Sequence, residues 1–186
     1  MSSDIKRIEQ KPLSDADLRT ILGASLKILK YSELANVSAL SSLLPSGQDY
    51  CIILYEREEN SGHWVALLRG SSESYGYEFF DPYGNNVDVP LKWTDKEDRQ
   101  ELGQAQPYLT KLLEASGERW EHSPYKFEEV SKTVNTCGHH CTHRIYRVLH
   151  NQMDLREYKE YMDHLKDKYR MDYDEVVSEF AQDFGM

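Results

Sequence analysis

A run of six residues without a charged side chain, Tyr50-Cys51-Ile52-Ile53-Leu54-Tyr55, sets the strongest constraint on the fold. An apolar run of strand length that does not alternate with polar residues is typical of a strand buried on both faces. We therefore expect residues 50–55 to form a central strand of a β-sheet that other elements cover.

Two more strands are predicted over 63–69 and 75–80, on either side of a turn cluster at 70–74. A hairpin centred on Ser72 places His63 directly opposite Asp81. Directly opposed residues have Cβ atoms roughly 4.5–5.5 Å apart, which is close enough for a hydrogen bond between an imidazole and a carboxylate. The expectation depends on the turn, because a slip of one residue would put the two side chains on opposite faces.

A third reactive group, the thiol of Cys137, lies at the start of a predicted helix that Asn135 or Thr136 can cap. The apolar positions that recur at helical spacing are Cys141, Ile145, Val148 and Leu149. Cys137 shares their face and is expected to point toward the sheet. The positive end of the helix dipole favours a thiolate there, and Gly138 leaves room for a substrate backbone.

Each of the three residues also has a purely structural interpretation. Asp81 opens Asp-Pro-Tyr-Gly, a typical type I turn, and His63 could be a hydrogen-bonded strand histidine. Cys137 could be a small buried apolar residue. Taken together, however, a thiol, a base and an orienting acid are what a cysteine hydrolase needs, because the thiol is mostly protonated near neutral pH.

The residues around these three groups resemble a known family. Gly62-His63-Trp64, the stretch 79–84 (Phe-Phe-Asp-Pro-Tyr-Gly) and Asn135-Thr136-Cys137-Gly138 are similar to motifs of the adenovirus-protease and SUMO-protease (Ulp1-like) cysteine peptidases. The stretch 135–139 is most similar to the maturation proteases of large DNA viruses and virus-like transposons. The resemblance extends over residues 13 to 180, with the specific motifs between 60 and 145.

The resemblance implies a role for each matching residue. Cys137 is the implied nucleophile, His63 the general base and Asp81 the acid that orients the base. Trp64 is similar to a tryptophan that roofs a narrow channel for glycine-rich substrate tails.

One part of the family pattern is missing. Members carry a glutamine a few residues before the cysteine, where its side chain completes the oxyanion hole, but residues 130–136 contain none. Asn135 is the candidate substitute, because a side-chain amide can donate beside the backbone N–H of Cys137. Asn135 could equally be only a helix cap.

The predicted elements form an α+β chain, a small mixed β-sheet with the nucleophile-bearing helix packed across it, and the resemblance implies a papain-like or Ulp1-like fold. Residues 13–186 are expected to form a single peptidase domain after a flexible lead-in at 1–12. A capping box at Ser14–Asp17 opens the first helix. Further helices are predicted over 37–44, 104–115, 155–169 and 173–184, and short strands around Trp120 and over 126–129.

The net charge of −10 and a pI near 5.2 argue against binding to nucleic acid and suit a basic protein partner instead. Three cysteines, an odd number, and the lack of a signal-peptide pattern predict a reducing compartment, cytoplasm or nucleus, or a virion. No run approaches the roughly 20 apolar residues of a membrane span. We expect a monomer without a cofactor.

Zinc binding is the rival chemistry, because Cys137, His140, Cys141 and His143 fall within seven residues. Structural zinc sites, however, draw ligand pairs from two separated segments, and four ligands on under two helical turns cannot all face one ion. His122 or His150 could supply a distant ligand. The three histidines that follow Cys137 form either a solvated face or a contact with substrate.

The favoured function is a thiol peptidase that cleaves after small or glycine residues. It would process a viral polyprotein or, as the alternative, remove ubiquitin or SUMO-type modifiers as a deconjugating isopeptidase. A second alternative is a non-catalytic module that binds a ubiquitin-like modifier. The retention of Cys137, His63 and Asp81 argues against this last alternative.

Overall fold

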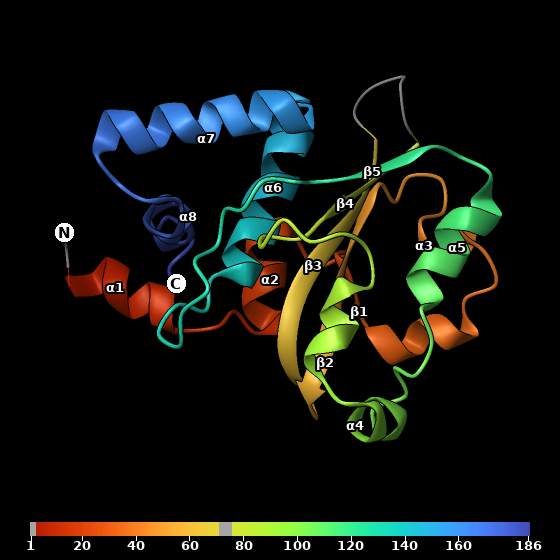
Figure 1. Cartoon of the computed structure of the whole chain (residues 1–186). Coiled ribbons are helices and arrows are strands. Elements are labelled where there is room, and N and C mark those ends of the chain that lie inside the picture. The colour runs from red at the N-terminus through yellow and green to blue at the C-terminus, as the bar shows by residue number, and fades with distance from the viewer. Residues whose placement is uncertain (1–2, 71–75) are drawn as a thin grey trace. The chain divides into compact units, whose positions relative to one another are not determined.

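A five-stranded mixed β-sheet is formed by the residues that the computed structural model describes, which are 3–70 and 76–186 (Figure 1). In sheet order the strands are β1 (Lys27–Lys30), β2 (Tyr50–Glu58), β3 (Ser61–Arg69), β4 (Tyr77–Phe80) and β5 (Trp120–His122). The inner pairs, β2 with β3 and β3 with β4, are antiparallel, and the outer pairs are parallel. The predicted α+β class with a small mixed sheet is therefore confirmed.

The chain folds into two units that alternate along the sequence. Residues 27–81 and 85–124 form one, which we call the sheet unit because it contains all five strands. Residues 1–26, 82–84 and 125–186 form the other, which we call the helical unit.

The sheet unit has one large apolar core on one face of the sheet. Cys51, Ile53 and Tyr55 of β2 point into this core, together with Val65 and Leu67 of β3. The covering elements are η1 (Tyr31–Asn36), α3 (Leu40–Leu43), η2 (Val89–Trp93) and α5 (Tyr108–Ser116). Successive side chains of a strand point to opposite faces, yet Ile52 and Leu54 are buried too. Residues 50–55 thus lie in a strand buried on both faces, as the apolar run predicts.

The helical unit contains α1 (Ser3–Gln10), α2 (Asp15–Leu22), α6 (Cys137–Asn151), α7 (Leu155–Tyr169) and α8 (Tyr173–Gln182). Helix α8 packs against α1, α6 and α7, and α2 packs against α6. Three of the five helices begin with a reciprocal capping box, in which the N-cap side chain and the third helical residue satisfy each other's backbone N–H groups. The Ser14–Asp17 box of α2 and the bounds of α7 match the sequence prediction.

Several boundaries differ from the prediction. Residues 3–10, expected within a flexible lead-in, form α1, in which Ile5 and Ile8 are buried on one face. The helix expected over 37–44 is reduced to α3, after the 3-10 turn η1. Helix α8 ends at Gln182, two residues before the predicted end.

The helix expected from Gln104 begins only at Tyr108, after Pro107. The side-chain amide of Gln104 accepts from the backbone N–H of Glu56 at 2.9 Å and donates to its carbonyl at 2.7 Å. Gln104 therefore extends the hydrogen bonding of β2. A further helix, α4 (Lys96–Glu101), precedes it and was not predicted.

The strand predicted over 126–129 is absent from the described residues of that segment. The backbone N–H groups of Phe127 and Glu128 both donate to one acceptor, the carbonyl of Pro82, at 2.8 and 3.0 Å. Two donors that share one carbonyl do not form a strand ladder, in which each residue pairs with a different partner.

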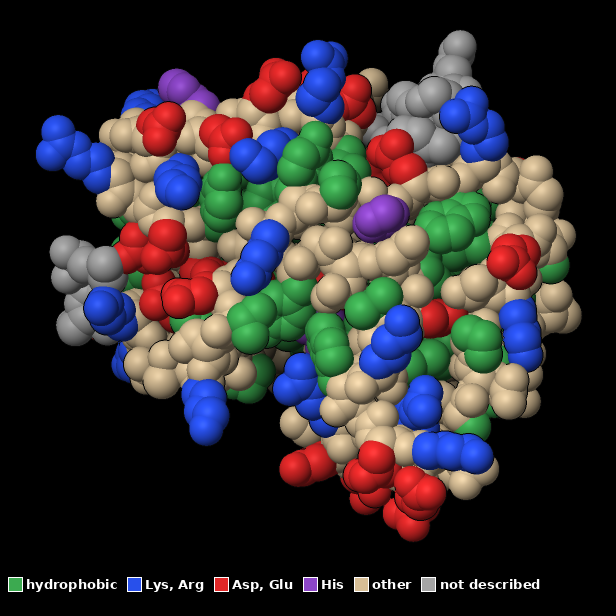
Figure 2. Space-filling model, viewed as in Figure 1, with side chains coloured by type: hydrophobic (Ala, Val, Ile, Leu, Met, Phe, Trp, Pro, Cys, Tyr) green, Lys and Arg blue, Asp and Glu red, His purple; other side chains and the backbone are tan. Residues whose placement is uncertain are grey.

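The face drawn in Figure 2 carries interspersed acidic and basic side chains, with acidic ones gathered over α4. A surface hollow in the sheet unit has mostly acidic walls. Its charged lining residues are Lys30, Glu56, Arg57, Glu58, Glu59, Asp98 and Glu101. Within the described part of the chain, no helix has both the length and the apolar character needed to cross a membrane.

Candidate active site

The imidazole of His63 and the carboxylate of Asp81 are hydrogen-bonded, with Nε2 and Oδ1 2.8 Å apart. His63 lies on β3, and Asp81 follows the last residue of β4. The strand register is displaced by two residues from the predicted one, because Ala66 pairs with Phe80 and not with Glu78. The turn expected about Ser72 lies outside the described residues.

A displacement of two residues preserves the face of every side chain, whereas a displacement of one would reverse it. His63 and Asp81 are therefore diagonal neighbours and not directly opposed. Diagonal neighbours on one face remain within reach of long and aromatic side chains. The predicted hydrogen bond forms although the predicted register is wrong.

Both members of the pair are withdrawn from solvent, since His63 is 3% exposed and Asp81 is 0% exposed. The second oxygen of Asp81 accepts a hydrogen bond from the side-chain amide of Asn85 at 3.1 Å. A carboxylate accepts, so Nε2 of a neutral His63 carries the hydrogen and Nδ1 is the ring's acceptor nitrogen. The pair thus fixes the tautomer that a general base requires.

Gly62 permits the close approach of β2 and β3 just before His63. A Cβ atom at this position would lie 1.9 Å from the backbone carbonyl oxygen of Tyr55. A contact this short with backbone cannot be relieved by rotating a side chain. The glycine of the Gly-His-Trp motif is therefore required by the packing of the sheet.

Trp93, at the end of η2, packs against the catalytic candidate His63, and the sequence analysis did not identify it. The two rings meet edge to face with centroids 5.1 Å apart, and the Arg57 guanidinium lies 4.9 Å from the Trp93 ring centroid. Trp93 is 38% exposed. By contrast Trp64, the predicted roof of a substrate channel, is 7% exposed and follows His63 on the strand, so the two side chains leave β3 on opposite faces.

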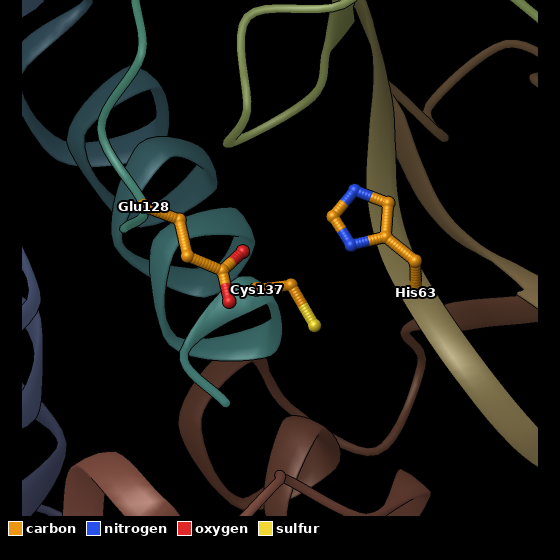
Figure 3. Close-up of side chains that lie close together, drawn as sticks. All are labelled: His63, Glu128 and Cys137. Carbon is orange, nitrogen blue, oxygen red and sulfur yellow. The ribbon is translucent and has the colours of Figure 1, made fainter. Parts of the chain in front are cut away.

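Cys137 is the first residue of α6, as predicted, and Thr136 occupies the N-cap position. The Cys137 side chain is buried, and a carboxylate oxygen of Glu128 lies within 4.8 Å of its sulfur. Oε1 of Glu128 also accepts the backbone N–H of Thr136 at 3.1 Å. Figure 3 draws Cys137 and Glu128, both of the helical unit, together with His63 of the sheet unit.

Thr136 does not cap the helix through its hydroxyl, which instead donates to Asp174 of α8. Asp174 also binds Nε2 of His140 at 2.9 Å and the backbone N–H of Glu129 at 3.0 Å. Burial alone would raise the pKa of Asp174, but its hydrogen bonds with His140 and Thr136 hold that pKa below the usual value. The start of α6 is therefore fastened to α8 by a buried carboxylate.

Asn135 is exposed and is oriented toward the end of α1. Its side-chain amide donates to the carbonyl of Gln10 at 3.0 Å, and its backbone N–H donates to the carbonyl of Glu9 at 2.7 Å. In these hydrogen bonds Asn135 acts neither as a helix cap nor as an oxyanion donor. To act as an oxyanion donor, the amide would have to leave Gln10.

The three histidines that follow Cys137 are core residues and not a solvated face, since His139, His140 and His143 are at most 1% exposed. Burial lowers the pKa of His139 to about 3, and burial together with the charge of Arg147 holds the pKa of His143 far below its usual value. At neutral pH both are therefore uncharged.

The rival zinc ligands His140 and His143 already have hydrogen-bond partners, since Nε2 of His140 binds Asp174 and Nδ1 of His143 binds Tyr158. None of the three cysteines forms a disulfide. Cys141 and Cys51 are fully buried, and burial raises the pKa of Cys51 to about 12. Both are core residues, as the sequence suggested. Farther along α6, Leu149 is exposed although its spacing predicted an inward position.

Comparison with known proteins relates the chain to a viral protein. Over 176 residues the chain is 30% identical to a protein of Sputnik virophage whose recorded name is "Uncharacterized protein V9". The match covers 94% of this chain and 97% of V9. The chain belongs to the V9 family. The sequence matches no family model. The name of V9 states no activity, so this similarity relates the chain to a virophage protein and does not identify a reaction.

Proposed function

We propose that this V9 relative is a cysteine peptidase with Cys137 as nucleophile, His63 as general base and Asp81 as the acid that orients the base. The observation that carries the proposal is the buried hydrogen bond between His63 Nε2 and Asp81, at 2.8 Å. A strand histidine held in one tautomer by a buried carboxylate is the base that a thiol nucleophile needs. The position of Cys137 in the first turn of α6 supports its role, because the helix dipole favours the thiolate there.

The reaction divides into two half-reactions. Nδ1 of His63 takes the thiol proton as sulfur attacks the scissile carbonyl, and the imidazolium then protonates the leaving amine, so that a thioester remains on Cys137. His63 next removes a proton from water, which attacks the thioester and releases the carboxylic acid while the thiol is restored. Asp81 stabilises the imidazolium in both halves. The proposal requires that the working enzyme bring His63 of the sheet unit to Cys137 of the helical unit.

The finer fold assignment is part of the same proposal. We infer a papain-like, Ulp1-like peptidase domain over residues 13–186, with α6 packed across the sheet. The support is the position of each residue: His63 lies on a strand, Asp81 directly follows a strand and Cys137 begins a helix. These positions fit the motifs at 62–64, 79–84 and 135–138.

The substrate is proposed to be a protein cut after a glycine-rich motif. Kinship with a virophage protein favours the processing of a viral polyprotein over the removal of ubiquitin or SUMO-type modifiers. The acidic hollow of the sheet unit suits a substrate with basic residues near the cleavage site. No cofactor enters the mechanism, and cysteines that form no disulfide fit a reducing compartment or a virion.

The decisive experiment tests one set of variants against two classes of substrate, modifier probes and peptides. Ubiquitin and SUMO carrying a C-terminal electrophile test for deconjugation, and a peptide library with cleavage sites read by mass spectrometry tests for a private sequence. Cys137→Ala is expected to abolish labelling and cleavage. The matched control is Cys141→Ala, which removes a buried thiol from the next turn of the same helix and should leave both intact.

Each outcome decides between named functions. Cleavage that survives in Cys137→Ala would overturn the assignment of the nucleophile. Labelling by a modifier probe would show that the function is deconjugation and not polyprotein processing. A wild-type protein that binds a ubiquitin-like modifier, and neither cleaves peptides nor is labelled, would be the non-catalytic module.

A further inference from the structure

Glu128 places a buried carboxyl group beside the nucleophile. Its side chain is 1% exposed, and one of its oxygens lies within 4.8 Å of Cys137 Sγ (Figure 3). The residue is nine positions before Cys137 in the sequence, in a segment without regular structure. The mechanism described above does not use it.

The backbone fixes Glu128 from two sides. Its own N–H, like that of Phe127, donates to the carbonyl of Pro82, and its Oε1 accepts the N–H of Thr136. Thr136 is the residue directly before Cys137. The carboxyl group is therefore held in a defined place relative to the start of α6.

An ionised Glu128 would oppose the proposed chemistry. Negative charge must form first on the sulfur of Cys137 and then on the carbonyl oxygen of the substrate, and a nearby carboxylate raises the energy of both. Burial disfavours the carboxylate form. The neutral acid has neither drawback.

A neutral acid also satisfies the observed hydrogen bond. Its carbonyl oxygen, Oε1, accepts from Thr136, and the other oxygen carries the hydrogen. That O–H is a donor on the same side chain that lies beside the reacting sulfur. Preorganised donors beside a nucleophile are the groups that stabilise a developing oxyanion.

We propose that Glu128 acts in its protonated form as a side-chain donor to the oxyanion of the tetrahedral intermediate. As the bond between Sγ and the carbonyl carbon forms, the π pair of the C=O bond moves onto oxygen, which accepts the Glu128 O–H and the backbone N–H of Cys137. The proton stays on Glu128 and no net transfer occurs. This inference rests on the proposed peptidase function and gives the oxyanion role to Glu128 in place of Asn135.

Comparing Glu128→Gln with Glu128→Ala tests whether Glu128 acts as a hydrogen-bond donor or as a negative charge. Glutamine can accept from Thr136 and still donate through its amide, whereas alanine can do neither. The exposed neighbour Glu129→Gln is the control for loss of one negative charge in this segment. The probes are a peptide aldehyde ending in Gly-Gly, which forms a tetrahedral adduct with the thiol, a fluorogenic peptide amide of the same sequence, and iodoacetamide.

Glu128→Gln is expected to keep turnover and aldehyde affinity within about tenfold of wild type, while Glu128→Ala loses about 10²–10³ in both. Alkylation of Cys137 by iodoacetamide should be retained in both variants, because that displacement builds no oxyanion. A Glu128→Gln protein that melts at the wild-type temperature but loses as much activity as Glu128→Ala would overturn the inference. Full activity in Glu128→Ala would do the same. If Glu128→Ala does not fold, Glu128→Met, which is close to glutamate in size and can neither accept from Thr136 nor donate, takes its place in the comparison.

Failure of the peptidase proposal looks different. In that case the wild-type protein forms no aldehyde adduct at Cys137, or Cys137→Ala cleaves the peptide as well as wild type. A failure confined to Glu128 leaves a Cys137-dependent peptidase whose oxyanion donor is another group.

Discussion

The carboxylate of Asp174 accepts a hydrogen bond from the hydroxyl of Thr136, so a side chain of α8 holds the residue directly before Cys137. The same carboxylate binds His140 and the backbone of Glu129. The geometry at the start of α6 therefore depends on α8, a helix that begins 36 residues after Cys137.

Replacing Asp174 with alanine should lower the free energy of unfolding by about 1.5–3 kcal/mol, since it leaves buried donors without their charged acceptor. Urea denaturation at pH 7 measures the change. Asp167→Ala, on the exposed face of α7, is the matched control and should have little effect. Because the Asp174 pKa is held below its usual value, this contribution is present above the unfolded pKa and disappears as pH falls through the folded pKa. An equal effect of the two substitutions would show that the network is not stabilising.

Glu9, near the end of α1, should make stability depend on pH in the opposite direction. Burial, followed by the carboxylates of Asp172 and Glu175, raises the pKa of Glu9 from 4.5 to about 7. The folded state therefore binds the proton more tightly than the unfolded state. The contribution of Glu9 to the free energy of unfolding should therefore fall as pH rises from 4.5 to about 7 and stay constant above that range.

Glu9→Gln removes the ionisation and should be more stable than wild type at pH 8, with a smaller difference at pH 5. Chemical denaturation at the two pH values measures this. Asp4→Asn, an exposed carboxyl on the same helix, supplies the comparison. A Glu9→Gln protein that gains nothing at pH 8 would show that this carboxyl ionises without cost.

His63→Ala should lower kcat by about 10²–10⁴ with little change in KM, because it removes the general base. Asp81→Asn should lower kcat less, since the remaining imidazole can still accept a proton, though without the carboxylate that stabilises its charged form. Steady-state kinetics on the peptide cleaved by wild type measures both. If Asp81→Asn keeps full activity, another acid orients His63.

Trp93 should act as a positioning residue through its edge contact with His63. An aromatic pair of this kind is worth about 0.5–1.5 kcal/mol, so Trp93→Ala should reduce kcat by about twofold to tenfold. Trp93→Phe keeps an aromatic face and should recover most of the loss. A role in folding alone would lower the melting temperature of Trp93→Ala and leave kcat and its pH profile unchanged.

Local patterns predicted the elements that depend on local chemistry. The Ser14–Asp17 capping box, the buried strand from Tyr50 and the helix over 155–169 can be read from neighbouring residues and are all present. The register between β3 and β4 depends on a turn that the sequence specifies poorly. The expected pairing was displaced by two residues, and the His63–Asp81 contact remained because only an odd displacement changes the face.

The residues that were missed contact the site through the tertiary fold. Glu128 and Trp93 lie in segments without a periodic pattern that would assign them to any site. His139, His140 and His143 look polar in sequence, and they are buried because α6 is enclosed on nearly all sides in its first turns. Asn135 has the residue type for a donor, but α1, which the composition made look flexible, takes its amide.

The short crossing at residues 82–84 has a genetic consequence. The chain leaves the sheet unit directly after Asp81, contributes three residues to the helical unit and returns at Asn85. Neither unit is one continuous stretch of the gene, so neither can be lost, duplicated or exchanged by a single recombination event. A single crossover between residues 85 and 124 would leave each unit of the chimera built from side chains of both parents.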